Sequence, residues 1–257
     1  MSKLSSISAV FPCYNDGASI PDVISRIETA LPELTDDYEI IVVNDGSTDS
    51  SGAVLAELSR ERPHLQVITL PHNQGYGAAI RTGLTAATRD YVFYTDGDGQ
   101  YDPSELQLLV ERIGPGIDVV NGYKISRSDS VYRKIVGNTY KAFVRTVFRL
   151  RLRDIDCDFR LLRREVLRGI RLQKDSGAFC VELVKKLQSA GAQFREVPVH
   201  HYPRQHGSSQ FMRPGRVFAT FVELAILWWQ LRRAPETRPH AVEEEALSGV
   251  QGRNGET

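Results

Sequence analysis

Cysteine is scarce in this sequence of 257 residues, which contains only Cys13, Cys157 and Cys180. The three are odd in number and widely spaced and form no CxxC pair, which argues against a disulfide framework and a cysteine zinc site. The histidines within residues 200–206 do not have the spacing of a standard zinc site either. The sequence therefore predicts a protein of a reducing, cytosolic setting without structural zinc.

Long hydrophobic runs are also lacking. The first fifteen residues contain no apolar core long enough for a signal peptide. The best candidate for a membrane element, 217–231, has about 15 residues, is interrupted by Thr220 and Glu223, and falls short of the roughly 20 residues that span a bilayer. A helix that lies at a membrane surface is compatible with this length, whereas a spanning helix is not.

An excess of one charge is absent too, because 32 basic residues balance 32 acidic ones. This balance gives no general attraction for nucleic acid. The charge is nevertheless segregated: residues 1–120 hold 7 basic and 18 acidic side chains, and residues 121–175 hold 15 basic and 6 acidic ones. An acidic first half is thus followed by a strongly basic middle.

The apolar residues predict an α/β fold. Short β-branched runs at 7–11, 38–43, 65–70 and 91–94 alternate with helical patterns at 18–31, 49–61 and 76–88. This alternation is typical of a mostly parallel, doubly wound sheet flanked by helices. The second half is less regular, and its expected elements are strands at 117–123 and 194–199, a helix around 141–149, and helices at 178–189 and 216–233.

Polar, turn-forming segments follow three of the expected strands, at 12–16, 44–49 and 96–100. Ligands of such sheets bind beyond the carboxyl ends of the strands. In the third segment Asp96, Asp98 and Gln100 form a row, and two carboxylates this close repel one another unless a cation lies between them. Mg²⁺ takes oxygen ligands and often only one or two carboxylates. The alternative is a solvated Asp-Gly turn, and Asp102 before Pro103 is better interpreted as turn and helix-start chemistry.

Four motifs resemble the family 2 glycosyltransferases with the Rossmann-like GT-A fold, and within them the dolichyl-phosphate mannose synthase group. They are residues 12–16 (PCYND), 42–49 (VVNDGSTD), 73–78 (NQGYGA) and 96–100 (DGDGQ), and the resemblance extends over about 7–212. It implies an inverting, metal-dependent enzyme of the cell envelope. Such an enzyme transfers a sugar from a UDP- or GDP-sugar to a polyprenyl phosphate such as undecaprenyl, decaprenyl or dolichyl phosphate.

The resemblance also implies site residues. The donor-binding residues would be Pro12, Tyr14, Asn15, Asp16, Asp45, Asn73, Asp96, Gly97, Arg204 and Gln210. Asp96, Asp98 and Gln100 would hold Mg²⁺ or Mn²⁺. Asp16 replaces the usual Glu, and Gln210 replaces the usual Lys. Residues 44–48 are also chemically sensible as a helix cap after a strand, which does not exclude ribose binding, and Asp45 is the preferred ligand.

The acceptor would be held by the basic middle of the chain. By resemblance, Lys124 and Arg133 contact its phosphate, and Gly137 stands where relatives have Ser. Asp154 aligns with an acid proposed as a base, so the catalytic residues would be Asp98, Asp154, Lys124 and Arg133. A hydroxyl acceptor requires such a base. A phosphate acceptor is already mostly dianionic, and Asp154 would then orient basic groups.

Other polar residues of the second half have two interpretations each. Lys141, Arg145 and Arg149 are individually best explained as a solvated helix face, although together they could attract anionic lipid. Glu182 is either an acid typical of the family or a solvated residue on a core-facing helix. Asp158 replaces a usual Gly.

The expected organisation is a glycosyltransferase domain at 1–212, an amphipathic helix at 213–233 and a disordered tail at 234–257. Trp228 and Trp229 followed by two arginines fit an interfacial helix, although packing against the domain or a dimer partner would explain them equally well.

We expect a cytoplasmic enzyme that is peripheral to the inner face of the membrane and does not bind nucleic acid. One alternative is the same donor chemistry with a soluble or glycan hydroxyl acceptor. Another is a non-catalytic nucleotide-binding module, but residues 75–80 lack the third Gly of a dinucleotide-binding fingerprint.

Overall fold

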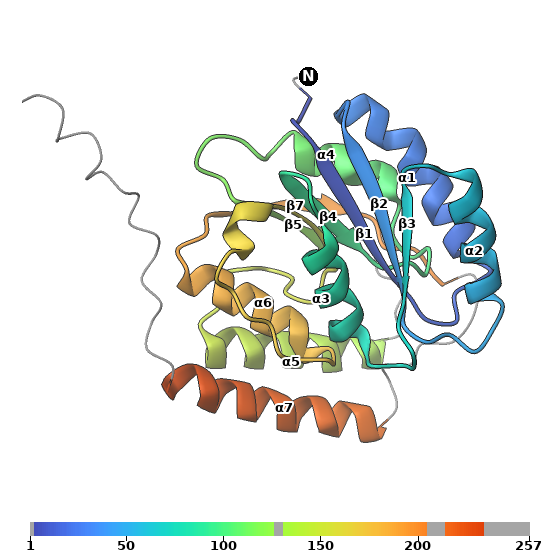
Figure 1. Cartoon of the computed structure of the whole chain (residues 1–257). Coiled ribbons are helices and arrows are strands. Elements are labelled where there is room, and N and C mark those ends of the chain that lie inside the picture. The colour runs from blue at the N-terminus through green and yellow to red at the C-terminus, as the bar shows by residue number, and fades with distance from the viewer. Residues whose placement is uncertain (1–2, 126–130, 205–213, 234–257) are drawn as a thin grey trace, which may run out of the picture.

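The chain folds around one seven-stranded sheet with helices on both faces (Figure 1). The computed structural model describes residues 3–125, 131–204 and 214–233, without the side chains of 131–136, 138 and 214–218. The expected tail, 234–257, lies outside the described residues, as does the predicted domain boundary at 212.

The strands follow the order β3-β2-β1-β4-β6-β5-β7. Their bounds are β1 Ile7–Cys13, β2 Tyr38–Asn44, β3 Leu65–Thr69, β4 Tyr91–Thr95, β5 Val119–Lys124, β6 Phe159–Arg163 and β7 Phe194–Val199. Neighbouring strands are parallel except at β6, which is antiparallel to both β4 and β5. The carboxyl ends of the other six strands therefore lie at one edge of the sheet, together with the start of β6.

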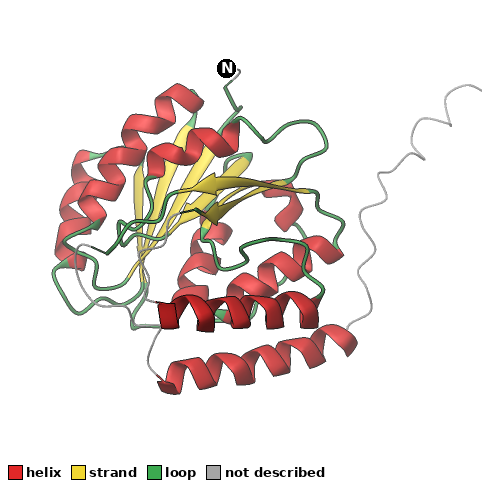
Figure 2. Ribbon diagram, turned by 180° about the vertical axis from the view of Figure 1, so that it is seen from behind, coloured by secondary structure: helices red, strands yellow, loops and turns green. Residues whose placement is uncertain are grey.

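The helices form layers on the two faces of the sheet (Figures 1 and 2). They are α1 Ile20–Leu34, α2 Ser51–Glu61, α3 Tyr76–Ala86, α4 Leu106–Val110, α5 Val131–Phe148, α6 Ala178–Ser189 and α7 Pro214–Arg233, with short turns η1 Pro103–Glu105 and η2 Arg164–Leu167. α1, α2 and α4 share one hydrophobic core with the sheet, and α3 and α6 share another on the opposite face.

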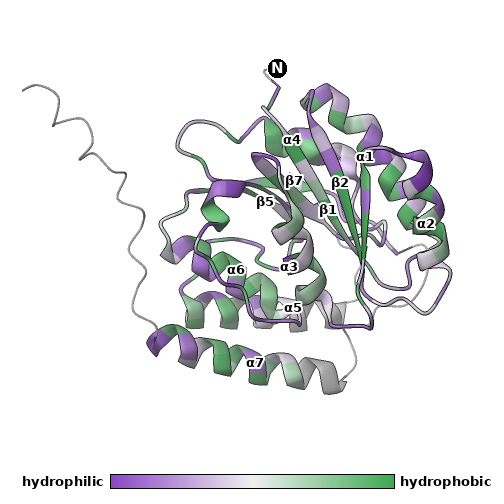
Figure 3. Ribbon diagram, viewed as in Figure 1, coloured by the Kyte–Doolittle hydropathy of each residue, from purple (hydrophilic) through white to green (hydrophobic). Residues whose placement is uncertain are grey.

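The sequence explains why these elements form. Every residue of β1 is buried, as a continuous apolar run between two helical layers requires. In α1 the buried residues Ile20, Val23, Ile24 and Ile27 recur at helical spacing and face that core. In Figure 3 much of β1 to β3 is correspondingly coloured hydrophobic, while parts of α2 are hydrophilic. The predicted mostly parallel α/β sheet is confirmed.

Strand β6 is the element that the sequence did not predict. Its five residues, FRLLR, carry arginine at the second and fifth positions, which breaks the apolar run. Arg160 is fully buried: Nε donates to Asn121 Oδ1 at 2.6 Å, Nη2 donates to the Ile155 carbonyl at 3.3 Å, and Nη1 bonds the Tyr94 hydroxyl. These bonds satisfy the donor groups of a buried charged side chain.

A third core joins α5, α6 and α7 beside the sheet, where Val144 and Phe148 meet Leu224 and Leu227. The predicted C-terminal amphipathic helix is thus present, and one side of it packs on the protein. Within the described residues, no helix is both long and apolar enough to cross a membrane.

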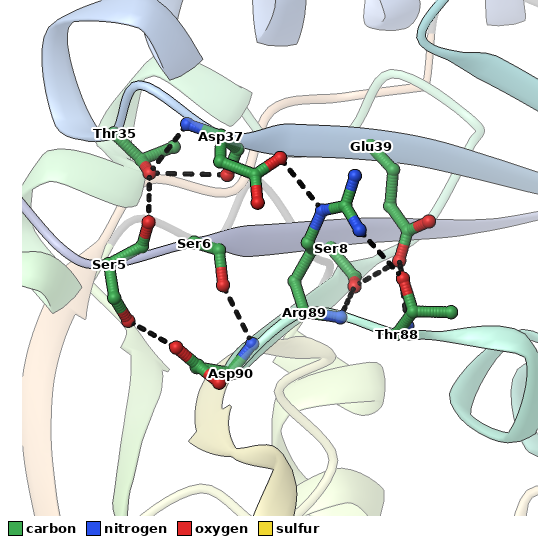
Figure 4. Close-up of polar contacts among 9 residues, drawn as sticks. All are labelled: Ser5, Ser6, Ser8, Thr35, Asp37, Glu39, Thr88, Arg89 and Asp90. Atoms are coloured by element: carbon green, nitrogen blue, oxygen red, sulfur yellow. Dashed lines mark hydrogen bonds and ion pairs between the residues drawn. The ribbon is translucent and has the colours of Figure 1, made fainter.

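A polar network closes the edge of the sheet opposite the strand carboxyl ends (Figure 4). Glu39 accepts hydrogen bonds from Ser8 Oγ at 2.6 Å and from Thr88 N at 2.7 Å and Oγ1 at 3.0 Å. Ser5 and Ser6 bond Asp90 in the same region. Burial raises the pKa of Glu39, but these hydrogen bonds outweigh it and leave the pKa below its ordinary value.

Candidate active site at the carboxyl edge of the sheet

Three charged residues from distant parts of the chain meet at this edge. Arg204, after β7, lies 3.4 Å from Asp16 Oδ1 through Nη1 and bonds Asp98 Oδ2 through Nη2. Asp16 follows β1 and Asp98 follows β4. Burial raises the pKa of Asp16 to about 6, although Arg204 acts in the opposite direction. The site thus combines two carboxylates and one cation within contact distance.

One N–H group of the Arg204 guanidinium makes no hydrogen bond to the described residues. Its Nε is buried and lacks a hydrogen-bond partner among the described residues. An unpaired buried N–H is costly unless a ligand or water completes it. Arg204 can therefore accept an anionic ligand without losing both of its carboxylate contacts.

Asp96 lies beside Asp98 in a crowded acidic environment. Its pKa is raised well above the ordinary value, first by burial and then by the negative charges of Asp158 and Asp98. Lys124 and a hydrogen bond from Tyr76 act in the opposite direction. Such mutual repulsion makes the pair of aspartates suited to a divalent cation, which would relieve it.

Gly97 allows these aspartates to reach the end of β1. A Cβ at this position would lie 2.4 Å from the Pro12 carbonyl oxygen and 3.0 Å from Ile20 Cδ1. No side chain fits at the first of these distances. Gly97 therefore serves close packing of the β4 loop on β1 and has no side chain with which to contact a donor.

Gln100 connects two loops of the site. Its Nε2 donates to the Tyr202 carbonyl at 3.1 Å, and the Tyr202 amide donates to the Gln100 carbonyl at 2.8 Å. The Gln100 amide also donates to Asp98 Oδ1 at 2.9 Å. The loop after β4 and the segment carrying Arg204 are thus held together through Gln100.

Asp45 and Asn15 hold loops around the predicted donor site. Asp45 accepts from the amides of Gln74 at 2.7 Å and Gly75 at 3.0 Å, and burial raises its pKa. Asn15, at a left-handed φ of 57°, accepts through Oδ1 from the Thr48 amide at 2.8 Å. Both side chains thus have protein partners that position the predicted nucleotide pocket.

The remaining predicted donor residues lie at the same edge. Pro12 is buried near the end of β1 and paired with Val43 of β2. Tyr14 is half-buried in the following loop, and Asn73 is exposed in the loop before α3. The structure brings these residues to the edge that also holds Asp16, whereas Gln210 lies outside the described residues.

Asp154 and Lys141 form a buried ion pair. Lys141 Nζ lies 2.6 Å from Asp154 Oδ1, and the side chains are 15% and 4% exposed. The expectation that Lys141 belongs to a solvated helix face is therefore wrong, while Arg145 and Arg149 are exposed as expected. Asp154 faces a cation, so its geometry favours the orienting role over that of a general base.

Lys124 lies next to this pair. Its Nζ donates to the Asp156 carbonyl at 2.9 Å and lies 5.7 Å from the centre of the Tyr101 ring. Burial disfavours its charged form, but Cys157 and the surrounding aspartates outweigh burial and raise its pKa. Lys124 thus remains a cation. Arg133, the other predicted basic residue, lies within α5, and its side chain is not described.

Asp156 and Asp158 were not predicted as site residues. Burial raises the pKa of Asp156 to about 6, against the effect of Lys124. Asp158 accepts a hydrogen bond from Cys180 Sγ at 3.0 Å and contributes to the raised pKa of Asp96. The alternating acids at 154, 156 and 158, just before β6, were the signal that could have identified them.

Two further interpretations are settled by the contacts. Asp102 accepts a hydrogen bond from the Ser104 amide at the start of η1, which confirms its helix-start role. Glu182 is not solvated: it is fully buried and accepts from the amides of Gln173 and Lys174. Within the described residues, no group of three or more His, Cys, Asp and Glu side chains is arranged to hold a metal ion. Any metal here would therefore rely on ligands beyond these side chains, as a substrate-bound Mg²⁺ commonly does.

A family model described as glycosyl transferase family 2 matches residues 8–171. The chain belongs to glycosyl transferase family 2. The matched range begins in β1 and includes all four motifs and the acidic segment before β6. The matched range therefore includes Asp16, Asp98 and Lys124, which lie at the carboxyl edge of the sheet.

Solved structures show the same fold. Glucosyl-3-phosphoglycerate synthase from Mycobacterium tuberculosis, in complex with Mn²⁺, UDP and phosphoglyceric acid, aligns with a TM-score of 0.67 at 21% identity, covering 91% of this chain and 80% of the other. Its complex with Mn²⁺ and UDP-glucose gives a TM-score of 0.65 at 19% identity, with 91% and 81% covered. This family 2 glycosyltransferase thus has the GT-A architecture that its motifs predict.

Proposed function

We propose that this family 2 glycosyltransferase uses a nucleoside diphosphate sugar and Mg²⁺ or Mn²⁺ to glycosylate a polyprenyl phosphate. The observation that carries the donor half is the convergence of Asp16 and Asp98 on Arg204, whose buried Nε has no partner among the described residues. This arrangement suits a diphosphate on Arg204 and a cation on the carboxylates. Glucosyl-3-phosphoglycerate synthase, which has been crystallised with Mn²⁺ or Mg²⁺ and UDP, supports the same donor chemistry.

The proposed metal ligands are Asp96 and Asp98, with Gln100 as a third oxygen donor. When bound, the cation would offset the charge of the leaving diphosphate. Around it, Pro12, Tyr14, Asp16 and Asp45 would line the nucleoside, with Asn15, Asn73 and Gly97 shaping their loops. Arg204 would hold the diphosphate, and Gln210, which follows in the sequence, would contribute to binding the same donor.

The proposed acceptor site is cationic. Lys124 lies near Asp96, Lys141 pairs with Asp154, and Arg133 would add a third positive charge. A phosphate monoester is mostly dianionic at neutral pH, so its oxygen attacks without a strong base. Asp154, already paired with Lys141, would then act by positioning that lysine.

We further propose that the chain lies at the cytoplasmic face of a membrane, where polyprenyl phosphates are found. Exposed apolar side chains on α5 and α7, namely Phe143, Phe221, Ile226 and Trp229, support contact with lipid. At the end of α7, Arg232 and Arg233 stack on the adjacent Trp228 and Trp229. Aromatic rings beside arginines are typical of helices at the headgroup layer.

A second candidate function is transfer to a hydroxyl of a soluble phosphorylated acceptor. It is favoured by the similarity to glucosyl-3-phosphoglycerate synthase, which has been crystallised with phosphoglyceric acid. Lys124 and Lys141 would then hold the phosphate while a hydroxyl attacks, and a general base would be required.

Incubation with Mn²⁺ and labelled UDP- and GDP-sugars separates these functions. Polyprenyl phosphate, 3-phosphoglycerate and an unphosphorylated oligosaccharide serve as parallel acceptors, and butanol partition separates lipid-linked label from aqueous product. Label in butanol supports the proposal, and label transferred only to phosphoglycerate supports the second candidate. Binding of no donor would exclude both.

Membrane contact requires a separate experiment. Co-sedimentation with vesicles of phosphatidylglycerol should fall at least about fivefold for Ile226→Ser with Trp229→Ser, since each loses buried apolar area. Ala225→Ser, a small change on the same exposed helix, is the matched control. Equal sedimentation of all three proteins would contradict membrane contact through α7.

A further inference from the structure

A cavity of about 560 Å³ lies outside the candidate active site. It is formed by the second half of α3, the turn η2 and residues 170–173. α3 begins at the loop that Asp45 holds (Figure 1). The lining residues of α3 come from its second half, so the cavity lies toward the other end of the helix. We call it the arginine pocket, after the side chains that line it.

Four arginines line this pocket: Arg81, Arg164, Arg168 and Arg171. The lining contains no aspartate or glutamate among the described residues. Four cations around one hollow create a positive potential within it. The nearest acids lie outside the lining: Asp175 pairs with Arg81, and Asp90 and Glu165 line a neighbouring hollow. The pocket is therefore electrostatically suited to an anion.

Three of the four arginines are not engaged elsewhere. The side chains of Arg164, Arg168 and Arg171 have no ion-pair or hydrogen-bond partner in the part of the chain that the structure describes. Neighbouring Arg163, by contrast, donates to the carbonyls of Ile117 and Gly114 at 3.1 Å each. Arg81 is held by Asp175 at 2.7 Å, outside the lining. Three guanidinium groups are thus available to a ligand.

The rest of the lining is mainly apolar: Leu84, Ala87, Leu167, Ile170 and Leu172. Leu84 and Ala87 are almost fully buried and belong to the core between α3 and the sheet. Inorganic phosphate alone would leave this surface uncovered. A ligand with an apolar body next to its anionic group would bury it as well.

We propose that the arginine pocket binds an organic phosphate or sulfate monoester with an apolar body. Guanidinium groups pair with such anions through two parallel hydrogen bonds, and the apolar lining contacts the attached group. Neither the nucleotide sugar nor the acceptor of the proposed reaction is required at this site.

Isothermal titration calorimetry with 1-naphthyl phosphate, in EDTA and without donor, tests the proposal. Wild-type protein should bind it at least tenfold more tightly than inorganic phosphate. Arg168→Ala with Arg171→Ala, and separately Thr85→Glu, should each weaken binding at least tenfold. Thr85 lines the pocket on the exposed side of α3, so its replacement places a carboxylate among the arginines without touching the core.

Two controls distinguish this site from others. Arg60→Ala with Arg195→Ala removes two exposed arginines elsewhere and should change affinity less than twofold. Asp98→Asn should also leave affinity unchanged, because binding does not involve the candidate active site. Unchanged affinity in Thr85→Glu, or no binding to the wild type at millimolar ligand, would overturn the proposal.

Vesicles that contain phosphatidic acid, a lipid with a phosphate monoester headgroup, identify the source of the anion. If Thr85→Glu loses both vesicle and naphthyl phosphate binding, the pocket takes a lipid headgroup. If only naphthyl phosphate binding is lost, the ligand is a soluble monoester. Both outcomes retain the chemistry proposed for the arginine pocket.

Discussion

At the scale of single residues, the hydrogen bonds to the Glu39 carboxylate should contribute measurably to the stability of the fold. Its carboxylate accepts three hydrogen bonds that join β1, β2 and the start of β4. We expect Glu39→Gln to lower the free energy of unfolding at pH 7 by about 1 kcal/mol. This is less than the roughly 1.5 to 3 kcal/mol of a hydrogen bond to a charged group because Glu39 is only half-buried. Urea denaturation measures this, and Glu57→Gln, at an exposed site, should have no effect.

The pH dependence of this effect has a definite sign. The pKa of Glu39 lies below its ordinary value of 4.5 in the folded state, so the folded protein binds fewer protons than the unfolded chain. Its contribution is complete above pH 4.5 and is lost as the pH falls through the folded pKa. The difference between wild type and Glu39→Gln should shrink below about pH 4.5. A constant difference would contradict the shift.

Gly97 gives a second prediction at this scale. Gly97→Ala would place a methyl group 2.4 Å from the Pro12 carbonyl oxygen, which forces the β4 loop away from β1. We expect a stability loss of about 1 to 3 kcal/mol, as for overpacking. Displacement of Asp96 and Asp98 should lower kcat/KM about 100-fold. Gly114→Ala is the matched control because a Cβ there meets nothing within 4 Å. Full activity of Gly97→Ala would show that the loop tolerates the shift.

At the scale of elements, α5 is joined to the segment before β6 through Lys141 and Asp154. Lys141→Met leaves Asp154 buried without its cation and should cost about 3 kcal/mol of stability, as for a broken buried pair. Lys141→Met with Asp154→Asn removes both charges and should recover much of that loss. Thermal or urea unfolding of the four proteins forms a double-mutant cycle. A double variant no more stable than Lys141→Met would contradict a direct pair.

The elements also show how far the sequence could predict this molecule. The βαβ units at 7–95 follow from apolar runs and turn residues, and they placed Asp16, Asp45 and Asp98 at one edge correctly. β6 was missed because Arg160 is satisfied by Asn121 and Tyr94, which lie far away in the sequence. Lys141, Arg145 and Arg149 share one spacing, so only the position of Asp154 reveals which of them is paired. Tertiary partners, rather than local pattern, decide such cases.

At the scale of the whole molecule, ligand binding should stabilise the fold. A donor nucleotide with Mn²⁺ at a hundredfold excess over its Kd adds about 2.7 kcal/mol to the free energy of unfolding. For a chain of this size we expect a rise in Tm of about 5 to 10 °C. Differential scanning fluorimetry with UDP or GDP and Mn²⁺ measures it. Asp98→Asn should fold normally and lose the rise, and an equal rise in the variant would exclude Asp98 as a metal ligand.

The reversed strand β6 also sets how accurately the two halves of the enzyme are aligned. The half that carries Asp98 and the half that carries Asp158 meet where β4 pairs with β6, from Tyr91 opposite Arg163 to Thr95 opposite Phe159. A slip of one residue in this register would shift Asp158 by about 3.4 Å along the strand and turn its side chains to the other face. The pairing of β4 with β6 thus fixes the distance between the proposed donor and acceptor sites. Arg160, which is buried in β6 and bonds Tyr94 of β4 and Asn121 of β5, holds this register in place.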